Sequence, residues 1–537
     1  MGRTGVDEAD AGPARPPGLS EGAFQSALAR LRAELGEAHV LADAAGLADY
    51  HDPYPFYDPS ETAPSAVVRP GSVEEIRAIL RLANEARIPL WTVSQGRNHG
   101  YGGPAPRVRG SVVMELSRLN RVLEVNQRSG YALIEPGVRF FDLYDHLRAE
   151  GHRLWPSVPA NGWGSVLGNA LERGMGGTAY GEHAERVCGL EVMLADGALM
   201  RTGMGALEGS KTWQLYRHGY GPSADGLFMQ SNFGVVTKLG LWLMPTPECF
   251  RVCEVKLRRE EDLAPLIEIV RPLKLNEVIQ TQVICHHGVE ITAVLTTRDQ
   301  WLKPGEKITP EVMARMLEQM NLGAWNVKFA LYGPEALVEA RWRVAQAAFA
   351  AIPGAELQSR IYAGDASPDQ IAPGDRIQAG VPWMSDISIV NWRGPQGAHL
   401  GFAPIAPVEP ADALNLMAIA RARCDEFGFD YMAGIGVSTR HMTPITMLLF
   451  DKSDPDERAR AHGLFKALVE DAGREGYGEY RTHIALMDLV ADQYGFGGHA
   501  QRRFNQRLKD ALDPNGVLSP GKQGIWPSAM AGREIGS

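Results

Sequence analysis

The chain has 537 residues, a formal net charge of −10 and 45% hydrophobic residues. Two large or three smaller domains are expected at this length, and the composition excludes a mainly disordered or fibrous chain. Because nucleic-acid-binding domains carry a basic excess and this chain carries an acidic one, we expect no nucleic-acid partner.

Cysteine content and apolar runs bear on the compartment. Five cysteines without a CxxC pair predict neither a disulfide framework nor a metal site, and they are typical of a reducing cytoplasm. The first residues lack the apolar core of a signal peptide, and no apolar run approaches the ~18 residues of a membrane-spanning helix. We therefore expect a cytoplasmic protein without membrane contact, in which residues 1–20, rich in Pro and Gly, form a flexible arm.

The first readable elements lead to a glycine-rich loop. Residues 66–68 are typical of a strand, and Ser72 with Glu75 forms a capping box for a helix whose apolar residues keep helical spacing to residue 83. Residues 88–93 are typical of a second strand, and the loop 95–103 follows at once. Strand, helix, strand and glycine loop form the outline of a mononucleotide-binding unit.

A second glycine-rich loop spans residues 161–169, and a helix is predicted to start at 170–173. Its Gly162-x-Gly164-x-x-x-Gly168 spacing is one residue too long for the Rossmann fingerprint. Glycines alone leave surface loops and a dinucleotide site open, but two such loops in one region favour a dinucleotide. The remaining elements expected here are strands at 111–116, 122–125 and 132–134 and a helix at 141–150, ended by Gly151.

The pattern changes after Pro245. Helical periodicity alternates with strand-like runs, which predicts a second, α+β domain over 246–477 after a first domain over 21–245. Residues 478–537 return to loop chemistry and are expected to fold back on the first domain. The predicted helices of the second domain are 263–273, 310–320, 335–351, 411–427 and 456–473.

Several motifs, in order and in both halves, carry a family resemblance between residues 52 and 527. The chain resembles the vanillyl-alcohol oxidase and 4-cresol dehydrogenase family of flavoproteins, and within it most resembles the eugenol oxidase and vanillyl-alcohol oxidase members. The motifs are GRNHGYGG at 96–103, GWGSVLGN at 162–169, QSNFGVVTK at 230–238, GAHLGFAP at 397–404, GEYRTH at 478–483 and PGKQGIWP at 520–527.

The resemblance implies an α+β, two-domain FAD-binding fold with a cap domain over the isoalloxazine ring. It implies FAD bound covalently through His399, a substrate phenol held by Tyr101, Tyr480 and Arg481, no metal, and a homodimer. His51 resembles a residue that helps to form the flavin bond. Further cofactor-binding positions carried over are Gly96, Arg97, Asn98, Gly100, Gly102, Gly164, Ser165, Gly168, Asn169, Gly234, Val235 and Lys522.

The three catalytic candidates also make chemical sense together. A benzylic carbon loses hydride readily only if the developing cation is stabilised, and a para phenolate does this by becoming a quinone methide. Because a free phenol has a pKa near ~10, the site must favour the anion, and an arginine with two tyrosine hydroxyl groups supplies the charge and the donors. We expect an oxidase of 4-alkyl-, 4-allyl- or 4-hydroxymethylphenols that reduces O2 to hydrogen peroxide.

Four pocket positions depart from the family oxidases by carrying smaller residues: Ala160 in place of an aspartate, Gly177 in place of a tyrosine, and Gly434 and Gly436 in place of bulkier residues. The expectation is a larger cavity that accepts bulky or methoxylated, lignin-type phenols. Loss of the aspartate leaves open a dehydrogenase with a non-oxygen acceptor. A second alternative keeps the fold and changes the substrate: an alcohol oxidase that acts on a non-phenolic compound. A flavin-binding protein without turnover is the third alternative.

Overall fold

The computed structural model describes residues 14–530, except for the side chains of residues 385 and 386. The predicted arm, 1–20, therefore lies largely outside the described residues, and the first helix, α1 (Glu21–Leu35), begins directly after it. Within residues 14–530, none of the helices combines the length and the apolar character that crossing a bilayer requires.

The N-terminal part contains a small sheet in which the predicted unit is recognisable. Strands β2, β4 and β3 are parallel, and α3 crosses between β2 and β3 with its apolar side buried. Ser72 caps this helix by accepting a hydrogen bond from the Glu75 N–H at 3.1 Å, which confirms the predicted start. The sheet order is β1 (Val40–Leu41), β2 (Ala66–Val68), β4 (Val112–Glu115), β3 (Leu90–Val93), and α3 spans Val73–Ala86.

A second, antiparallel sheet packs its own core against α4 (Phe140–Ala149). The predicted strands at 122–125 and 132–134 are found here as β5 and β6. The helix expected to start at 170 is instead α5 (Val166–Leu171), because Ser165 caps it from in front by accepting from the Gly168 N–H at 3.0 Å. The strand order is β5 (Val122–Asn126), β6 (Tyr131–Ile134), β10 (Val235–Trp242), β8 (Val187–Met193), β9 (Leu199–Arg201).

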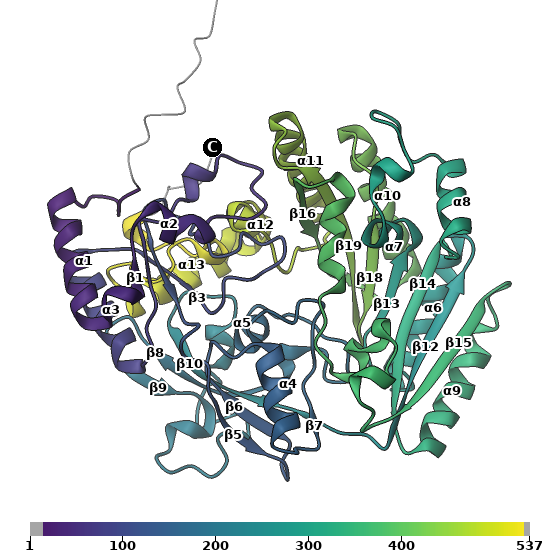
Figure 1. Ribbon diagram of the computed structural model, residues 1–537, viewed down its shortest axis with the longest axis horizontal. Helices are drawn as coiled ribbons and strands as arrows, with labels where there is room; N and C mark the ends of the chain where they lie inside the picture. The colour runs from purple at the N-terminus through teal and green to yellow at the C-terminus, as the bar shows by residue number, and fades with distance from the viewer. Residues whose placement is uncertain (1–13, 531–537) are drawn as a thin grey trace, which may run out of the picture.

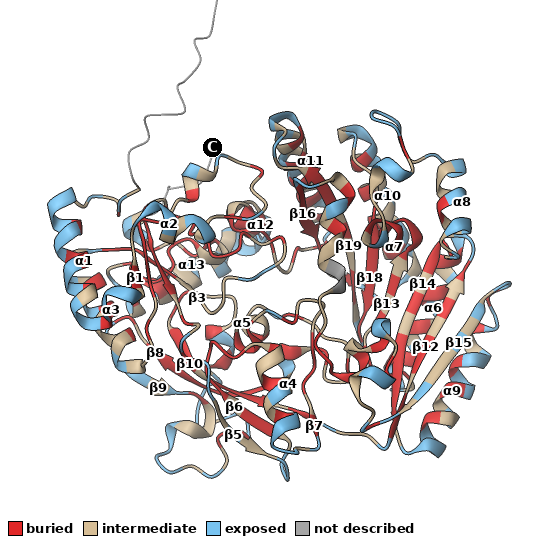
Figure 2. Cartoon of the chain, in the orientation of Figure 1, coloured by how far each residue is buried: buried red, intermediate tan, exposed pale blue. Residues whose placement is uncertain are grey.

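The C-terminal half is built on an eight-stranded antiparallel sheet. One face packs against α6 (Leu263–Leu275), α9 (Glu335–Phe349), α10 (Pro410–Phe427) and α11 (Pro455–Arg474), so strands such as β12 and β18 are buried while α9 keeps an exposed outer face (Figures 1 and 2). The strands are β15 (Glu356–Ala363), β12 (Cys249–Leu257), β14 (Trp325–Gly333), β13 (Val283–His287), β18 (Ala433–Val437), β19 (His441–Asp451), β16 (Gly397–Phe402), with β17 (Ala406–Pro407) beside β19.

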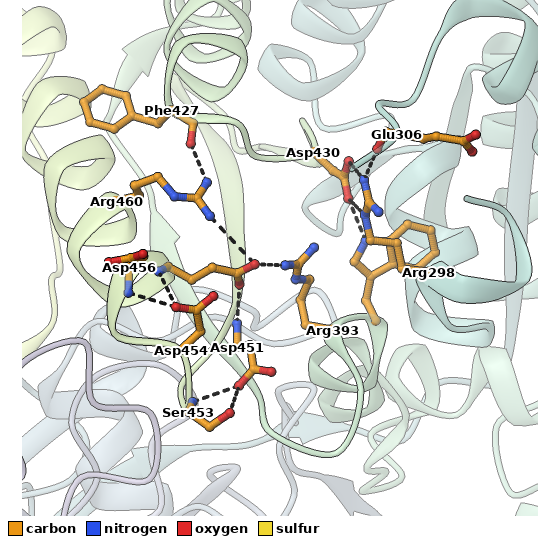
Figure 3. A network of polar contacts seen from close by, with 12 residues as sticks. Arg298, Glu306, Arg393, Phe427, Asp430, Asp451, Ser453, Asp454, Asp456 and Arg460 are labelled. Carbon is orange, nitrogen blue, oxygen red and sulfur yellow. Dashed lines mark hydrogen bonds and ion pairs between the residues drawn. The ribbon is translucent and has the colours of Figure 1, made fainter. Parts of the chain in front are cut away.

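A polar network anchors the segment that leads into β16. The Asp430 carboxylate accepts hydrogen bonds from Arg298 Nε at 2.7 Å and from Trp392 Nε1 at 3.0 Å (Figure 3). Arg393, the next residue, donates to Glu457. Trp392 and Arg393 end the 3-10 helix η12 (Ser385–Arg393), so these bonds hold the chain just before the strand that carries His399.

The C-terminal segment returns to the first domain, where α12 (Met487–Gln493) and α13 (Phe496–Leu512) lie beside the N-terminal elements (Figure 1). The Leu90 N–H donates to the Val517 carbonyl at 2.7 Å. Lys509 and Asp513, both fully buried, form an ion pair at 2.8 Å. The ammonium group also donates to the carbonyls of Asn232 and Leu518, at 2.8 and 2.6 Å, and so joins three segments.

Replacing Lys509 with Met should destabilise the protein by about 3–5 kcal/mol, because Asp513 is left as a buried, unpaired charge. Urea unfolding followed by circular dichroism measures the change. The exposed Lys466 of α11 provides the control, and Lys466→Met should change the unfolding free energy by less than about 0.5 kcal/mol. Equal effects of the two substitutions would contradict the prediction.

Candidate active site

The first glycine loop follows β3 and closes on itself through one side chain. The Asn98 amide accepts from the Gly103 N–H at 2.7 Å and donates to the Gly103 carbonyl at 3.2 Å. Inside this loop Gly100 has φ +81°, and a Cβ there would lie 2.7 Å from His399 Nδ1. Only glycine lets the loop approach the histidine this closely.

His399 lies on β16, where it is buried. Its ring stacks on the ring of His99, with the centroids 4.6 Å apart, and its Nε2 lies 3.1 Å from Met447 Sδ. Burial first and His99 second hold the pKa of His399 well below its usual value, and Nδ1 has no hydrogen-bond partner. A neutral imidazole with an unpartnered ring nitrogen is the form in which histidine acts as a nucleophile.

His99 was missed as a functional candidate, although it stands inside the quoted glycine motif. Burial lowers its pKa to about 4, so both stacked rings are neutral at physiological pH. Tyr54 packs edge-on against His99, with centroids 5.6 Å apart. In the described part of the chain, His51 makes no ring contact with His399, so the segment 51–54 reaches His399 through Tyr54 and His99.

The three catalytic candidates come together from two distant parts of the chain. The Arg481 guanidinium carbon lies 4.3 Å from the ring centroid of Tyr101 and 5.4 Å from that of Tyr480. Burial opposes the charge, but Tyr101 and Tyr480 outweigh it and raise the pKa of Arg481. Burial raises the pKa of Tyr480 to about 12, so its hydroxyl group stays protonated and can donate a hydrogen bond.

Within residues 14–530 the Arg481 guanidinium forms no ion pair, although the charge of Glu172, which is itself paired with Lys522, contributes to its raised pKa. Among the described residues, no carboxylate lies within ion-pair distance of Arg481, and its Nε is buried without a hydrogen-bond partner. The adjacent Glu479 is buried, with both carboxyl oxygens 3.0 Å from the Ala403 N–H. Burial raises the pKa of Glu479 well above its usual value, against the smaller opposing effects of the Ala403 N–H and Arg481, and so favours its protonated form.

Hydrogen bonds from four parts of the chain hold the loop that carries Tyr480 and Arg481. Tyr494 Oη donates to the Glu479 carbonyl and Gln230 Nε2 to the Tyr480 carbonyl, both at 2.9 Å. Two further hydrogen bonds act on the same loop. The Ile405 N–H donates to the Gly478 carbonyl at 2.9 Å, and His483 Nε2 lies 2.9 Å from the Asp52 carboxylate. Gln230 begins the motif at 230–238, but the sequence did not indicate it as a site residue. Its φ of +46° is strained for a non-glycine residue.

Burial and ion pairing act in opposite directions on Asp52. Burial would raise its pKa, but the charge and hydrogen bond of His483 outweigh this and keep the pKa below the usual value. The contact between Asp52 and His483 ties the N-terminal segment to the Arg481 loop.

Some of the other predicted cofactor-binding residues lie in the two glycine loops, and others lie in the buried core of the first domain. Asn161 ties the two glycine loops together, because its Nδ2 donates to the Arg97 carbonyl at 3.1 Å and its carbonyl accepts from the Gly164 N–H at 3.2 Å. Asn169 Oδ1 lies 2.6 Å from His183 Nδ1. Gly234 packs against Val192, Val235 is buried in β10, and Lys522 forms an ion pair with Glu172.

Comparisons with known proteins agree with this geometry. Residues 64–203 match the model of the FAD binding domain, and residues 384–523 match that of the C-terminal domain of FAD linked oxidases. The chain is 35% identical to the 4-cresol dehydrogenase flavoprotein subunit of Pseudomonas putida, over 95% of this chain and 97% of that protein.

Solved structures agree as well. The 4-ethylphenol oxidase from Gulosibacter chungangensis has a TM-score of 0.91 at 36% identity, over 96% of this chain and all (100%) of the other. For p-cresol methylhydroxylase the TM-score is 0.90 at 34% identity, over 96% and 99%. The chain belongs to the vanillyl-alcohol oxidase/p-cresol methylhydroxylase family of flavoproteins. Its predicted fold class is thereby confirmed, while the narrower likeness to eugenol oxidase stays a prediction.

The residues present fit the FAD of this flavoprotein family. Two tied glycine loops lie against a neutral histidine that keeps an unpartnered nitrogen. A further buried polar atom without a partner, Ser157 Oγ, lies near Gly176, seven residues after the second loop. Unpartnered buried polar atoms of this kind indicate a polar ligand.

Neighbouring side chains occupy the space beside three of the small pocket residues, while the larger cavity stays a prediction. At Gly177 the space for a Cβ is filled by Ile377. At Gly436 it is filled by Gln282, whose Nε2 would lie 2.7 Å away, and at Gly434 by the Glu290 carboxylate, 3.1 Å away. Ile377, Gln282 and Glu290 therefore lie where a Cβ at these three positions would point. Ala160 is half-buried in the loop before Gly162.

Replacing Glu479 with Gln should stabilise the flavoprotein at pH 8 and leave its stability unchanged near pH 4. The raised pKa of Glu479 means that the folded state keeps a proton which the unfolded state releases above its own, ordinary pKa, so stability falls as pH rises through this interval. Thermal unfolding of both proteins across pH 4–8 checks this. A constant difference in melting temperature at all pH values would contradict it.

Proposed function

We propose that the chain is an FAD-dependent oxidase of para-substituted phenols. The observation that carries the proposal is the Arg481 guanidinium, buried against Tyr101 and Tyr480 with no carboxylate partner in the described chain. The similarity to 4-cresol dehydrogenase and 4-ethylphenol oxidase, which are named for such phenols, supports it.

The proposed role of these residues is to bind the substrate as a phenolate. A phenol with an ordinary pKa near ~10 is mostly neutral at pH 7. A nearby positive charge and hydrogen bonds that favour the anion lower this pKa, and they act more strongly in a site that excludes water. Because burial raises the pKa of Glu479 and so favours its protonated form, the charge of Arg481 is available to the substrate oxygen.

The phenolate makes the chemistry at the para position feasible. Its electron density moves into the ring as hydride leaves the benzylic carbon, and the product is a neutral quinone methide. FAD, when bound, supplies the hydride acceptor and passes the electrons to O2. The quinone methide then adds water, or loses a proton to give an alkene, while Tyr101, Tyr480 and Arg481 keep the oxygen in place.

Arg481→Met should slow flavin reduction by a 4-alkylphenol by about 10- to 150-fold, the range of one hydrogen bond to a charged group. Anaerobic stopped-flow bleaching by 4-ethylphenol measures the rate. 4-Ethylanisole, which cannot ionise, should not bleach the wild-type flavin. The exposed Arg474→Met is the matched control and should retain the wild-type rate. Bleaching by the anisole would exclude a phenolate mechanism and favour the alcohol-oxidase alternative.

We also propose that FAD is attached covalently through His399. The neutral ring of this residue, its unpartnered Nδ1 and the glycine loop packed against it support the assignment. Acid-precipitated wild-type protein should stay yellow, whereas His399→Ala should release the flavin into the supernatant with its circular dichroism unchanged. Colourless precipitated wild-type protein would overturn the assignment.

The electron acceptor is the remaining part of the proposal. Likeness to an oxidase supports O2, while likeness to a dehydrogenase and the absence of an aspartate at Ala160 favour another acceptor as the second candidate. Production of one hydrogen peroxide per phenol in air should occur if O2 is the acceptor. Slow reoxidation in air with rapid reduction of a redox dye would favour the dehydrogenase.

A further inference from the structure

One face of the eight-stranded sheet carries His399 and continues into a row of polar side chains. In antiparallel pairs, residues directly opposite each other point to the same face. His399 lies opposite Leu449, and Gly434 lies opposite both Ile445 and His286. Because Ile445 and Leu449 are an even number of residues apart, His399, Gly434 and His286 share one face. His286 is three strands from His399, or roughly 14 Å across the sheet.

Glu290 places a carboxylate on this face. It lies in the first turn of α7 (Gly288–Leu295), directly after β13, and is only 4% exposed. Its Oε2 lies 3.1 Å from His286 Nδ1. The same oxygen lies 3.1 Å from the position of a Cβ at residue 434. A side chain at 434 would push the carboxylate away, so the glycine is what allows the acid to occupy this place.

Two further polar groups lie beside the acid. Gln282 Nε2 approaches the Cβ position of Gly436 to 2.7 Å and donates toward Met175 Sδ at 2.9 Å. Met175 lies between Gly174 and Gly176 in the FAD-binding domain, so the sheet meets that domain here. Thr443 lies opposite Gly436, is fully buried (0% exposed), and its Oγ1 has no hydrogen-bond partner.

A buried hydroxyl group without a partner is uncommon and indicates a missing ligand. The wall thus combines a carboxylate, a carboxamide and an unpartnered hydroxyl group where an apolar pocket for an alkyl chain would need none. A carboxylate accepts hydrogen bonds only, while the carboxamide and the hydroxyl group both donate and accept them. A hydroxyl group on the substrate meets both requirements, because it donates to Glu290 and accepts from Thr443 or Gln282.

We propose that Glu290, Gln282 and Thr443 bind the far end of the para substituent, and that the preferred substrates are phenols whose side chain ends in a hydroxyl group. This inference rests on the proposed function, because it assigns the side-chain subsite of the same phenol pocket. The three residues are specificity determinants, and they take no part in hydride removal.

Two substrates of equal size test the proposal: 4-(3-hydroxypropyl)phenol and 4-butylphenol, which differ by a hydroxyl in place of a methyl group. The kcat/KM of the holoenzyme for each gives a ratio. In the wild type the ratio should favour the hydroxylated phenol by about tenfold or more, as expected for a hydrogen bond to a charged group. Glu290→Leu and the isosteric Thr443→Val should each bring the ratio toward one.

Glu318, exposed on α8 (Pro310–Gln319), provides the control, and Glu318→Leu should keep the wild-type ratio. If Glu290→Leu fails to fold, Thr443→Val alone decides. A wild-type ratio near one, or a ratio that neither substitution changes, overturns the inference while turnover of 4-ethylphenol keeps the proposed function. Absence of flavin bleaching with any phenol overturns the proposed function itself.

Discussion

A buried guanidinium that forms no ion pair with any carboxylate of residues 14–530 is the constraint on which this site depends. Arg481 lies against the rings of Tyr101 and Tyr480, and removing its charge from water is unfavourable unless another anion compensates. Two acids interact with this charge without forming an ion pair with it: burial raises the pKa of Glu479, which favours its protonated form, and Glu172 is paired with Lys522. The protein therefore keeps a positive charge for the oxygen of a ligand, and the proposed chemistry follows from it.

Holding such a charge in place requires a rigid backbone, and the chain supplies it from far apart. Asp52 reaches His483 across 431 residues, and Gln230 reaches Tyr480 across 250. The polar network around Asp430 and Glu457 does the same for the segment that precedes His399. The site is consequently a property of the complete fold, because neither half contains both Tyr101 and Arg481.

In the wall of the proposed pocket, side chains from neighbouring elements fill the space beside three glycines and determine its polarity. Glycine at 177, 434 and 436 is matched by Ile377, Glu290 and Gln282 on neighbouring elements, so the packing density stays high while the chemistry changes. A glycine in place of a bulkier residue suggests a larger cavity when only that position is considered. Protein interiors are close-packed, however, and a neighbouring side chain fills the space. In the proposed pocket, substrate specificity then depends on the neighbouring side chains, Glu290 and Gln282.

Much of this protein could be predicted from sequence alone because the signals are local. Apolar periodicity and Ser72 located α3, and the motifs identified the family and grouped Tyr101, Tyr480 and Arg481. Other features required tertiary contacts. The stacking of His99 on His399, the hydrogen bond from Gln230 to the Tyr480 carbonyl and the carboxylate beside Gly434 join residues distant in sequence, and the raised pKa of Glu479 depends on burial. No periodicity encodes such pairings, and burial, which sets protonation and fills space, exists only in the folded chain.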